Sequence, residues 1–433
     1  MADLLASLPE AISPQYVMSE PNAAICLYRG PVRVRIGANT WRAAGALTYT
    51  WFPSSGLILR IREVPGSASG AQFPLEADFE ISGGRPFRGS LLSIGSRTEL
   101  TFLLSTVEKT YVSGPLTKLL FHIPNFVRYG GNFVRKANSY YGGRIEATYD
   151  CWKVTIDQIK DANLNNKLHL PGSFDITHVG LLERSDGMQF YFDDVQDVLR
   201  CLGITFTFIR GGWCVPFLLV GQDNDGNKMH AIWETVRIDP IFGGRSWFPR
   251  TATIEAFSEL LPLVADKMRR EKDGQDLQAL VDWYAFLLKN TGEPYFALPI
   301  VTSALDLIFW DIFVGGGIIK DENSIDKLNV ADRIRLILDK LKVSSDIPPA
   351  CEELKKAAES KNWADLPHAL TELRNSLVHP KKRERLYQVT PRAVWDVVRV
   401  GIQYLELGIL RMLGYKGSYW DRISDKEAAV PWA

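Results

Sequence analysis

The sequence has no excess of charge of either sign. Its 433 residues include 50 Lys and Arg against 50 Asp and Glu, so the formal net charge is zero with neutral histidines. A chain with this balance is not attracted as a whole to nucleic acid or to an anionic membrane. Any contact with RNA therefore has to come from a local cluster of basic residues.

Cysteine is scarce and scattered. No two of the five cysteines have Cys-x-x-Cys spacing, and none pairs with a histidine at the spacing of zinc ligands. They are Cys26, Cys151, Cys201, Cys214 and Cys351. We expect free thiols in a reducing cytoplasm, no bound metal and no cofactor.

Targeting signals and long apolar runs are also missing. The first residues lack the basic start and the long apolar stretch of a signal peptide. The most apolar predicted helix, residues 301–314, contains Asp306 and Asp311, which a membrane span would not readily tolerate. We expect a cytoplasmic protein that does not enter a membrane.

Familiar ligand-binding loops are incomplete. Residues 221–227 resemble part of a calcium loop, but Gly221 and Ile232 occupy positions that need carboxylates, so a hairpin turn is predicted there. The three glycines at residues 315–317 lack the Gly-Lys-Ser/Thr ending of a phosphate loop and indicate the stop of a helix. The sequence also lacks a Gly-x-Ser-x-Gly nucleophile elbow.

The first 250 residues have the pattern of a β-rich region. Short runs rich in Val, Ile, Thr and aromatic residues alternate with turn residues, which is typical of strands. We predict a sandwich-like β domain over residues 1–115. A mixed α+β domain with a sensor or regulatory role would follow over residues 116–250, with a helix near residues 193–202.

After Pro249 the apolar period changes to about 3.6, which indicates helices. They are predicted at residues 252–269, 275–289, 295–314, 330–341 and 391–413. Thr390 and Pro391 form the N-cap and first residue of the last helix. The fold class expected is therefore multidomain α+β, in which residues 251–433 form an all-α helical bundle after the β-rich region.

One predicted helix carries residues with a chemical function. Asp365 can cap its start, and its apolar side chains at residues 366, 370, 373 and 377 form a buried stripe. Arg374, Asn375 and His379 lie off that stripe. Pro380 disfavours helical geometry for the residue before it, so the helix should end at His379 and leave its ring free to turn back.

The pattern Arg374–Asn375–x–x–x–His379, followed by proline and lysines, resembles the signature of the HEPN superfamily. Four segments in order, SALDLIFWDIF, VADRIRLILDKLKV, SSDIPPACEELKKA and DLPHALTELRNSLVHP, resemble the helices of its ApeA-like subgroup. The resemblance implies a metal-independent endoribonuclease of an anti-phage, abortive-infection type. It also implies a homodimer in which two such helix ends form one site, and a possible phage-derived trigger acting on the N-terminal region.

The residue types suit that chemistry. A histidine can move protons at neutral pH, an arginine can hold phosphate oxygens bidentately, and Asn375 can orient substrate or imidazole. The products would be a 2′,3′-cyclic phosphate and a 5′-hydroxyl. A basic run after the helix would bind the RNA backbone; it consists of Lys381, Lys382, Arg383 and Arg385.

Two comparisons with the superfamily refine the expectation. Relatives silenced by nucleotidylation carry a tyrosine two residues after the histidine, where this chain has Lys381, so we do not expect that control. Many relatives carry a glutamate on an earlier helix where this chain offers Asp306, for which we expect a buried or capping role instead.

Other interpretations of the motif stay open. Arginine and histidine are common at helix C-termini because both favour the negative end of the helix dipole, and lysines after a helix often form a solvated face. HEPN domains also include non-catalytic members. The alternative function is therefore a binding or dimerisation module that docks RNA or a protein partner.

Overall fold

The computed structural model describes residues 7–62, 76–94, 99–137, 139–159, 171–321, 325, 327–379, 381 and 387–433. By its internal contacts the chain forms two compact units. Unit 1 comprises Met1–Gly203 with Cys214–Gly243, and unit 2 comprises Ile204–Trp213 with Gly244–Ala433. The division into three domains at residues 115 and 250 stays a prediction.

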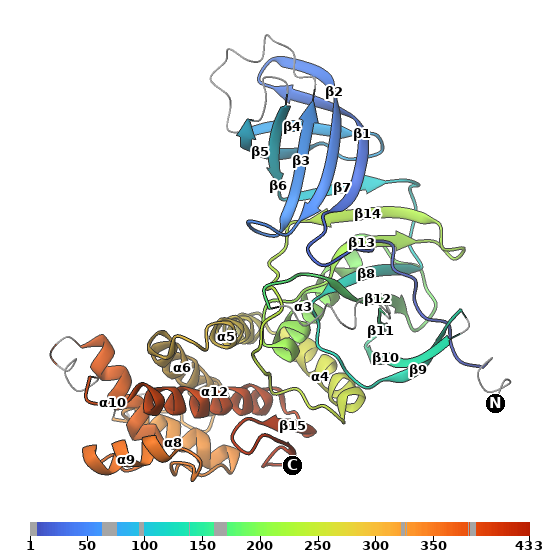
Figure 1. Ribbon diagram of the computed structural model, residues 1–433. Coiled ribbons are helices and arrows are strands. Elements are labelled where there is room, and N and C mark those ends of the chain that lie inside the picture. Colours follow the sequence, from blue (N-terminus) through green and yellow to red (C-terminus); the bar gives the residue numbers. More distant parts are fainter. Residues whose placement is uncertain are drawn as a thin grey trace. The chain divides into compact units, whose positions relative to one another are not determined.

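Unit 1 begins with a closed antiparallel barrel whose strand order is β1-β2-β3-β6-β5-β4 (Figure 1). Strand β1 closes it by pairing with β2 on one side and β4 on the other. The strands are β1 (Ile25–Ile36), β2 (Asn39–Thr50), β3 (Gly56–Arg62), β4 (Glu76–Ile81), β5 (Phe87–Ile94) and β6 (Glu99–Leu104).

The predicted sandwich is therefore wrong, because a single sheet closes on itself. Two interior glycines make the curl possible. A Cβ on Gly45 would come within 2.2 Å of Val32 Cγ2, and one on Gly89 within 2.4 Å of Leu104 Cδ2. Alternation of apolar and polar residues is the same in a sandwich and in a barrel, so that pattern could not distinguish them.

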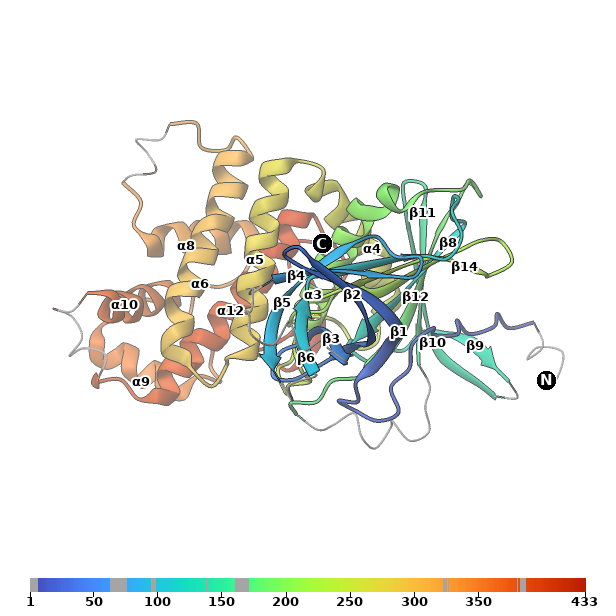
Figure 2. The same ribbon diagram turned by 90° about the horizontal axis from the view of Figure 1, so that it is seen from above.

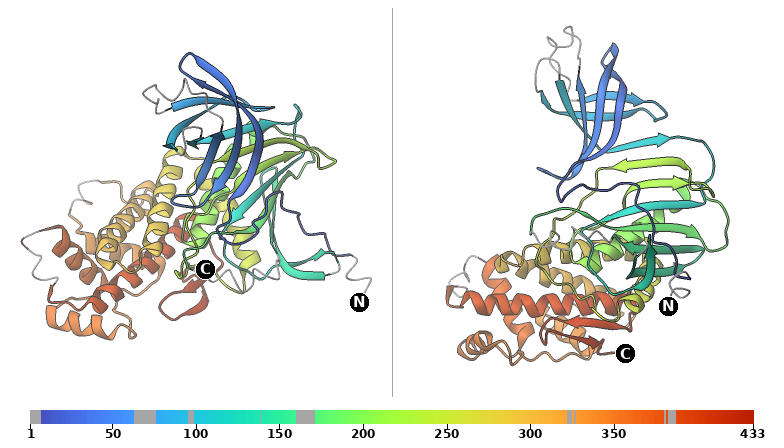
Figure 3. Two further views of the ribbon diagram at one scale, coloured as in Figure 1. Left: turned by 45° about the horizontal axis from the view of Figure 1, so that its top comes forward. Right: turned by 45° about the vertical axis from the view of Figure 1, so that its right-hand side comes forward.

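The rest of unit 1 is built on an eight-stranded antiparallel sheet, with order β7-β14-β13-β8-β12-β11-β10-β9 (Figure 3). Its strands are β7 (Thr106–Thr110), β8 (Lys118–Pro124), β9 (Asn132–Lys136), β10 (Ser139–Tyr149), β11 (Trp152–Gln158), β12 (Ile176–Arg184), β13 (Phe217–Gln222) and β14 (Lys228–Glu234). The short 3-10 helix η2 (Phe192–Val195) and helix α3 (Gln196–Arg210) lie between β12 and β13 in the chain. The hairpin predicted at residues 221–227 is confirmed, since this turn joins β13 to β14.

The N-terminal segment is held on this sheet by buried polar side chains. His122 Nε2 accepts hydrogen bonds from the backbone N–H groups of Gln15 and Tyr16, at 3.1 and 3.0 Å. Asp157 Oδ2 accepts from the N–H of Ile12 at 2.7 Å, while Arg144 forms a bidentate pair with the same carboxylate. These contacts tie an extended segment to the sheet without regular strand pairing.

Unit 2 is mainly helical (Figure 2). Its helices are α4 (Thr253–Met268), α5 (Glu271–Lys289), α6 (Pro294–Phe309), the π-helical η3 (Trp310–Gly315), α8 (Val330–Leu341), α9 (Glu352–Lys361), α10 (Leu366–Val378) and α12 (Pro391–Leu413). Helix α6 is central, with contacts to α5, α8, α10 and α12. The predicted helix positions are confirmed, and so is the N-cap of α12, where the Thr390 side chain accepts from the N–H of Ala393.

Among the described helices, the stretch Pro294–Gly315 is long and apolar enough to cross a membrane by length and composition alone. Half of its apolar window is buried inside the structure. Asp306 and Asp311 within it form ion pairs with Arg333 and Lys267. A core helix of a globular unit passes the same test of length and composition.

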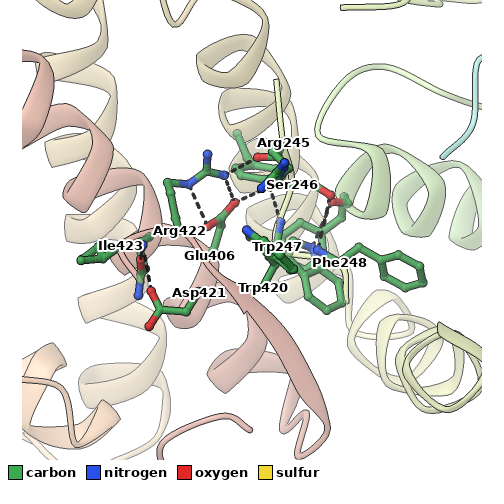
Figure 4. Close-up of polar contacts among 12 residues, drawn as sticks. Arg245, Ser246, Trp247, Phe248, Glu406, Trp420, Asp421, Arg422 and Ile423 are labelled. Atoms are coloured by element: carbon green, nitrogen blue, oxygen red, sulfur yellow. Dashed lines mark hydrogen bonds and ion pairs between the residues drawn. The ribbon is translucent and has the colours of Figure 1, made fainter. Parts of the chain in front are cut away.

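The expectation of an all-α C-terminal domain is wrong, because the chain ends in a β-hairpin of β15 (Ser418–Asp421) and β16 (Lys426–Ala429). Figure 4 shows how its turn is anchored. Arg422 lies against the buried Glu406 of α12 and donates to the Arg245 carbonyl at 2.6 Å. The backbone N–H of Ile423 donates to Gln403 Oε1 at 3.0 Å. Four-residue strands are too short to show a clear period of two in the sequence.

Candidate functional site

The helix that carries the candidate residues is fixed at its start. Asp365 caps α10 by accepting a hydrogen bond from the backbone N–H of His368 at 2.9 Å, as predicted. Arg335 of α8 donates to both carboxylate oxygens of Asp365, at 2.7 and 3.0 Å. Burial alone would raise the pKa of Asp365, but the hydrogen bonds from Arg335 and from His368 N–H outweigh it and hold that pKa below its usual range.

The predicted apolar stripe orients α10 in the unit. Leu366, Leu370 and Leu373 are fully buried, whereas Leu377 is only half-buried. Ser376 is buried beside it, and its hydroxyl donates to the Glu372 carbonyl at 2.8 Å. The stripe therefore holds the first three turns firmly and releases the last one toward the surface.

The helix ends at Val378, and His379 follows as an extended C-cap residue with φ −111° and ψ 107°. The predicted end of the helix at His379 is confirmed. The backbone N–H of His379 still donates to the Asn375 carbonyl at 3.0 Å, while its side chain is exposed. No described group forms a hydrogen bond with the ring.

Arg374 and Asn375 lie together at the same helix end. Both are half-buried, and Arg374 Nη1 donates to Asn375 Oδ1 at 3.2 Å. Within the described part of the chain, Arg374 forms no ion pair with a carboxylate. Among the described residues its guanidinium is oriented by a neutral amide, which suits a group that receives a phosphate.

The basic run is only partly covered by the structure. Lys381 is exposed. Lys382, Arg383 and Arg385, together with Pro380, lie outside the described residues. The assignment of these residues to RNA binding stays a prediction.

Asp306 has a partner that the sequence did not reveal. Its carboxylate forms an ion pair with Arg333 of α8 at 2.7 Å, and the Arg333 guanidinium also lies over the Phe309 ring. This pairing joins α6 to α8. The contact is the one expected of a structural carboxylate, and it accounts for the charge of Asp306 without a substrate.

A second polar cluster in unit 2 escaped prediction. On α12 the guanidinium groups of Arg392 and Arg399 lie over Trp395, 4.8 and 5.4 Å from the ring centre. Both arginines face the buried Asp396, at 3.6 and 3.8 Å. Burial raises the pKa of Asp396 despite the two arginines. The spacing of these four residues, i, i+3, i+4 and i+7, was the only available signal.

Within the described residues, no group of three or more His, Cys, Asp or Glu side chains gathers at a point where it could hold a metal ion. The candidate groups at the end of α10 are the guanidinium of Arg374, the amide of Asn375 and the imidazole of His379. Together they can bind a phosphate and transfer a proton.

Comparison with known proteins finds similarity to YopA. Residues 112–244 match the YopA central domain, and residues 270–431 match the YopA C-terminal domain. The SPbeta prophage-derived uncharacterized protein YopA of Bacillus subtilis (strain 168) is 24% identical over 454 residues, covering 98% of each chain. The chain is similar to YopA over nearly its whole length. Helix α10 lies within the matched C-terminal segment, whereas barrel strands β1–β6 precede both matched segments. No solved structure matches the chain.

Proposed function

We propose that the protein is a metal-independent endoribonuclease of the HEPN type, with Arg374, Asn375 and His379 in its active site. The observation that carries the proposal is the exposed His379 ring at a broken helix end, one turn after Arg374. Among the residues that the structure describes, none forms a hydrogen bond with the His379 ring and no carboxylate pairs with Arg374. A histidine packed into its own core would have favoured a structural role instead.

The reaction is an internal transfer at phosphorus. His379 takes the proton of the ribose 2′-hydroxyl while the 2′-oxygen forms a bond to the adjacent phosphorus. Arg374 stabilises the negative charge that builds on the phosphoryl oxygens. The bond from phosphorus to the 5′-oxygen breaks, and a second imidazole protonates that oxygen. The products are a 2′,3′-cyclic phosphate and a 5′-hydroxyl.

The second imidazole comes from a second copy of the chain. One helix end supplies one histidine, whereas the reaction needs a base and an acid at the same phosphate. A homodimer that brings two α10 ends together would supply both, with Asn375 orienting Arg374 in each half.

In the cell we place this activity in the cytoplasm of a prokaryote, in anti-phage defence by abortive infection. Unit 1 would act as the regulatory region that receives a phage-derived trigger. The relative in Bacillus subtilis is prophage-derived, and a resident prophage gains from a nuclease that stops the growth of a competing phage.

The test is cleavage of labelled single-stranded RNA and transfer RNA by the purified protein in EDTA, with analysis of the product ends. We expect cleavage that survives chelation and leaves cyclic-phosphate ends. Cleavage that requires a divalent ion, or that leaves a 3′-hydroxyl, would contradict the proposal. RNA binding without cleavage under every trigger tried would favour the docking module.

A further inference from the structure

Basic residues on the barrel are unusual in type and in position. Every basic residue among residues 25–104 is an arginine, with no lysine or histidine. Most of the described ones have an acidic partner in unit 1. Arg33 pairs with Glu80, Arg35 with Asp78, Arg62 with Glu99, Arg85 with Glu108, and Arg88 with Glu76 and Asp78.

Arg29, Arg42 and Arg60 are the exceptions. All three are exposed, and none forms an ion pair with a described residue. Unpaired arginines scattered over a surface would be unremarkable. These three, however, lie on one outer face of the barrel, made by β1, β2 and β3.

The strand register places them around a shallow floor. Ala46 of β2 lies opposite Arg29 of β1 and opposite Arg60 of β3, so the two arginines flank it on either side. Two strand spacings put their backbones about 10 Å apart. One step along β2, Ala44 lies between Pro31 and Arg62.

A like-charged pair closes one end of this face. Arg42 lies directly opposite Arg33 in the β1–β2 pairing. Like charges in such a position destabilise a sheet unless something compensates them. The Arg33 partner, Glu80, is 3.7 Å away and largely exposed, so it compensates weakly.

The face is also hollowed. A concavity of about 470 Å³ is lined by Arg29, Pro31, Arg42 and Ala44, with glycines between them. Two of the three arginines line it among small residues, and Arg60 lies outside its lining. An arginine guanidinium binds phosphate oxygens through two parallel N–H donors, which favours arginine over lysine for this contact.

We propose that the β1–β2–β3 face of the barrel binds the sugar-phosphate backbone of a single nucleic-acid strand. The width between the arginine rows suits one strand lying along β2, with phosphates held at the rim. This surface does not depend on the α10 site, and it would keep its role if the protein cleaved nothing.

The test is fluorescence anisotropy with a labelled 20-nucleotide RNA and the matching DNA, using the full chain with His379→Ala so that cleavage cannot intervene. The patch variant carries Arg29→Gln, Arg42→Gln and Arg60→Gln. The control carries Arg35→Gln, Arg85→Gln and Arg88→Gln, which removes the same charge from paired positions of unit 1. Thermal melting confirms that both variants stay folded.

We expect the patch variant to lose affinity about 10- to 100-fold and its salt slope to fall by about 2, since each phosphate contact contributes roughly 0.7 for single strands. The control should stay within about twofold by the weak effect of exposed pairs. Equal affinity for the RNA and the DNA would support recognition of the phosphate backbone. A preference for the RNA would indicate additional contacts with the 2′-hydroxyl.

Three results would overturn the proposal. Equal losses in patch and control variants would mean that only net charge matters. Absence of binding by the otherwise unmodified chain at low salt would mean that the face has no nucleic-acid ligand. Binding to vesicles of phosphatidylserine and phosphatidylcholine, lost in the patch variant, without binding to RNA or DNA would assign the face to a membrane.

Discussion

Arg335 and Asp365 form a bidentate ion pair, at 2.7 and 3.0 Å, that joins α8 to the first turn of α10. The same carboxylate caps the helix whose other end carries Arg374 and His379. The position of the candidate site therefore depends on a contact about three helical turns away from it.

Two substitutions of Asp365 should separate the stability contributed by the helix cap from that contributed by the ion pair with Arg335. Asp365→Ala removes both and should destabilise unit 2 by about 1–2 kcal/mol, whereas Asp365→Asn keeps a good cap and should cost less. Urea unfolding followed by circular dichroism at 222 nm measures both variants. Equal losses would show that the cap contributes nothing and that the pair with Arg335 accounts for the whole effect.

The Glu406–Arg422 pair should behave as a buried pair that tolerates removal of both partners better than of one. Glu406→Ala leaves the Arg422 guanidinium, whose side chain is only 15% exposed, without its carboxylate and should cost about 3–5 kcal/mol. The double variant Glu406→Met with Arg422→Met should recover most of that loss. Thermal melting of Glu406→Met, Arg422→Met and the double variant gives the coupling, and losses that simply add would contradict the account.

The stability of unit 1 should decrease as the pH is lowered, because the buried His122 favours its neutral form in the folded state. Burial lowers the pKa of His122 to about 4, below its usual 6.5, so the folded unit favours the neutral ring. This contribution is complete above pH 6.5 and is lost as pH falls toward 4, about 3 kcal/mol at 1.36 kcal/mol per unit. His178 shifts in the same direction, to about 3.

Native-state hydrogen exchange of β8 and β13, the strands around His122, measures this loss between pH 6.5 and 4.5. His122→Gln should make the pH dependence shallower. An unchanged slope in that variant would mean that His122 does not titrate with unfolding in this range.

Asn375 should act on cleavage through Arg374. Asn375→Ala frees the guanidinium and should lower the cleavage rate modestly, whereas Asn375→Asp gives Arg374 a permanent anionic partner that competes with the phosphate. We expect the Asp variant to be slower than the Ala variant by about tenfold, as a charged hydrogen bond replaces a neutral one. Single-turnover kinetics measure the ratio, and an Asp variant as fast as the Ala variant would contradict this role of Arg374.

The sequence allowed the local features of unit 2 to be predicted. Helix periods, the Asp365 and Thr390 caps and the end of α10 at His379 follow from neighbouring residues. The β15–β16 hairpin was missed because each strand has only four residues. The ion pair between Asp306 and Arg333 was missed because its two residues are 27 positions apart and on different helices.

Closure of the barrel could not be predicted from the sequence, because it depends on pairing between strands that are far apart along the chain. Alternating residues in β1 to β6 fit a sandwich equally well, and closure shows only in the pairing of β1 with β4. The β1–β2–β3 face of the barrel could not be predicted for the same reason. Arg29, Arg42 and Arg60 are spread over 32 positions and become neighbours only once the register of three strands is known.

The central claim is most directly tested by single-turnover RNA cleavage in EDTA with two histidine variants of the same helix. His379→Ala should be slower than the unmodified protein by about 10²- to 10⁴-fold, the usual contribution of a general acid-base. His368→Ala, at the start of α10, should stay within a few fold, because its ring accepts a local hydrogen bond from the Ala364 N–H and lies at the opposite end of the helix from Arg374 and His379. Full cleavage by the His379→Ala protein, or equal losses in both variants, would contradict the assignment of the site.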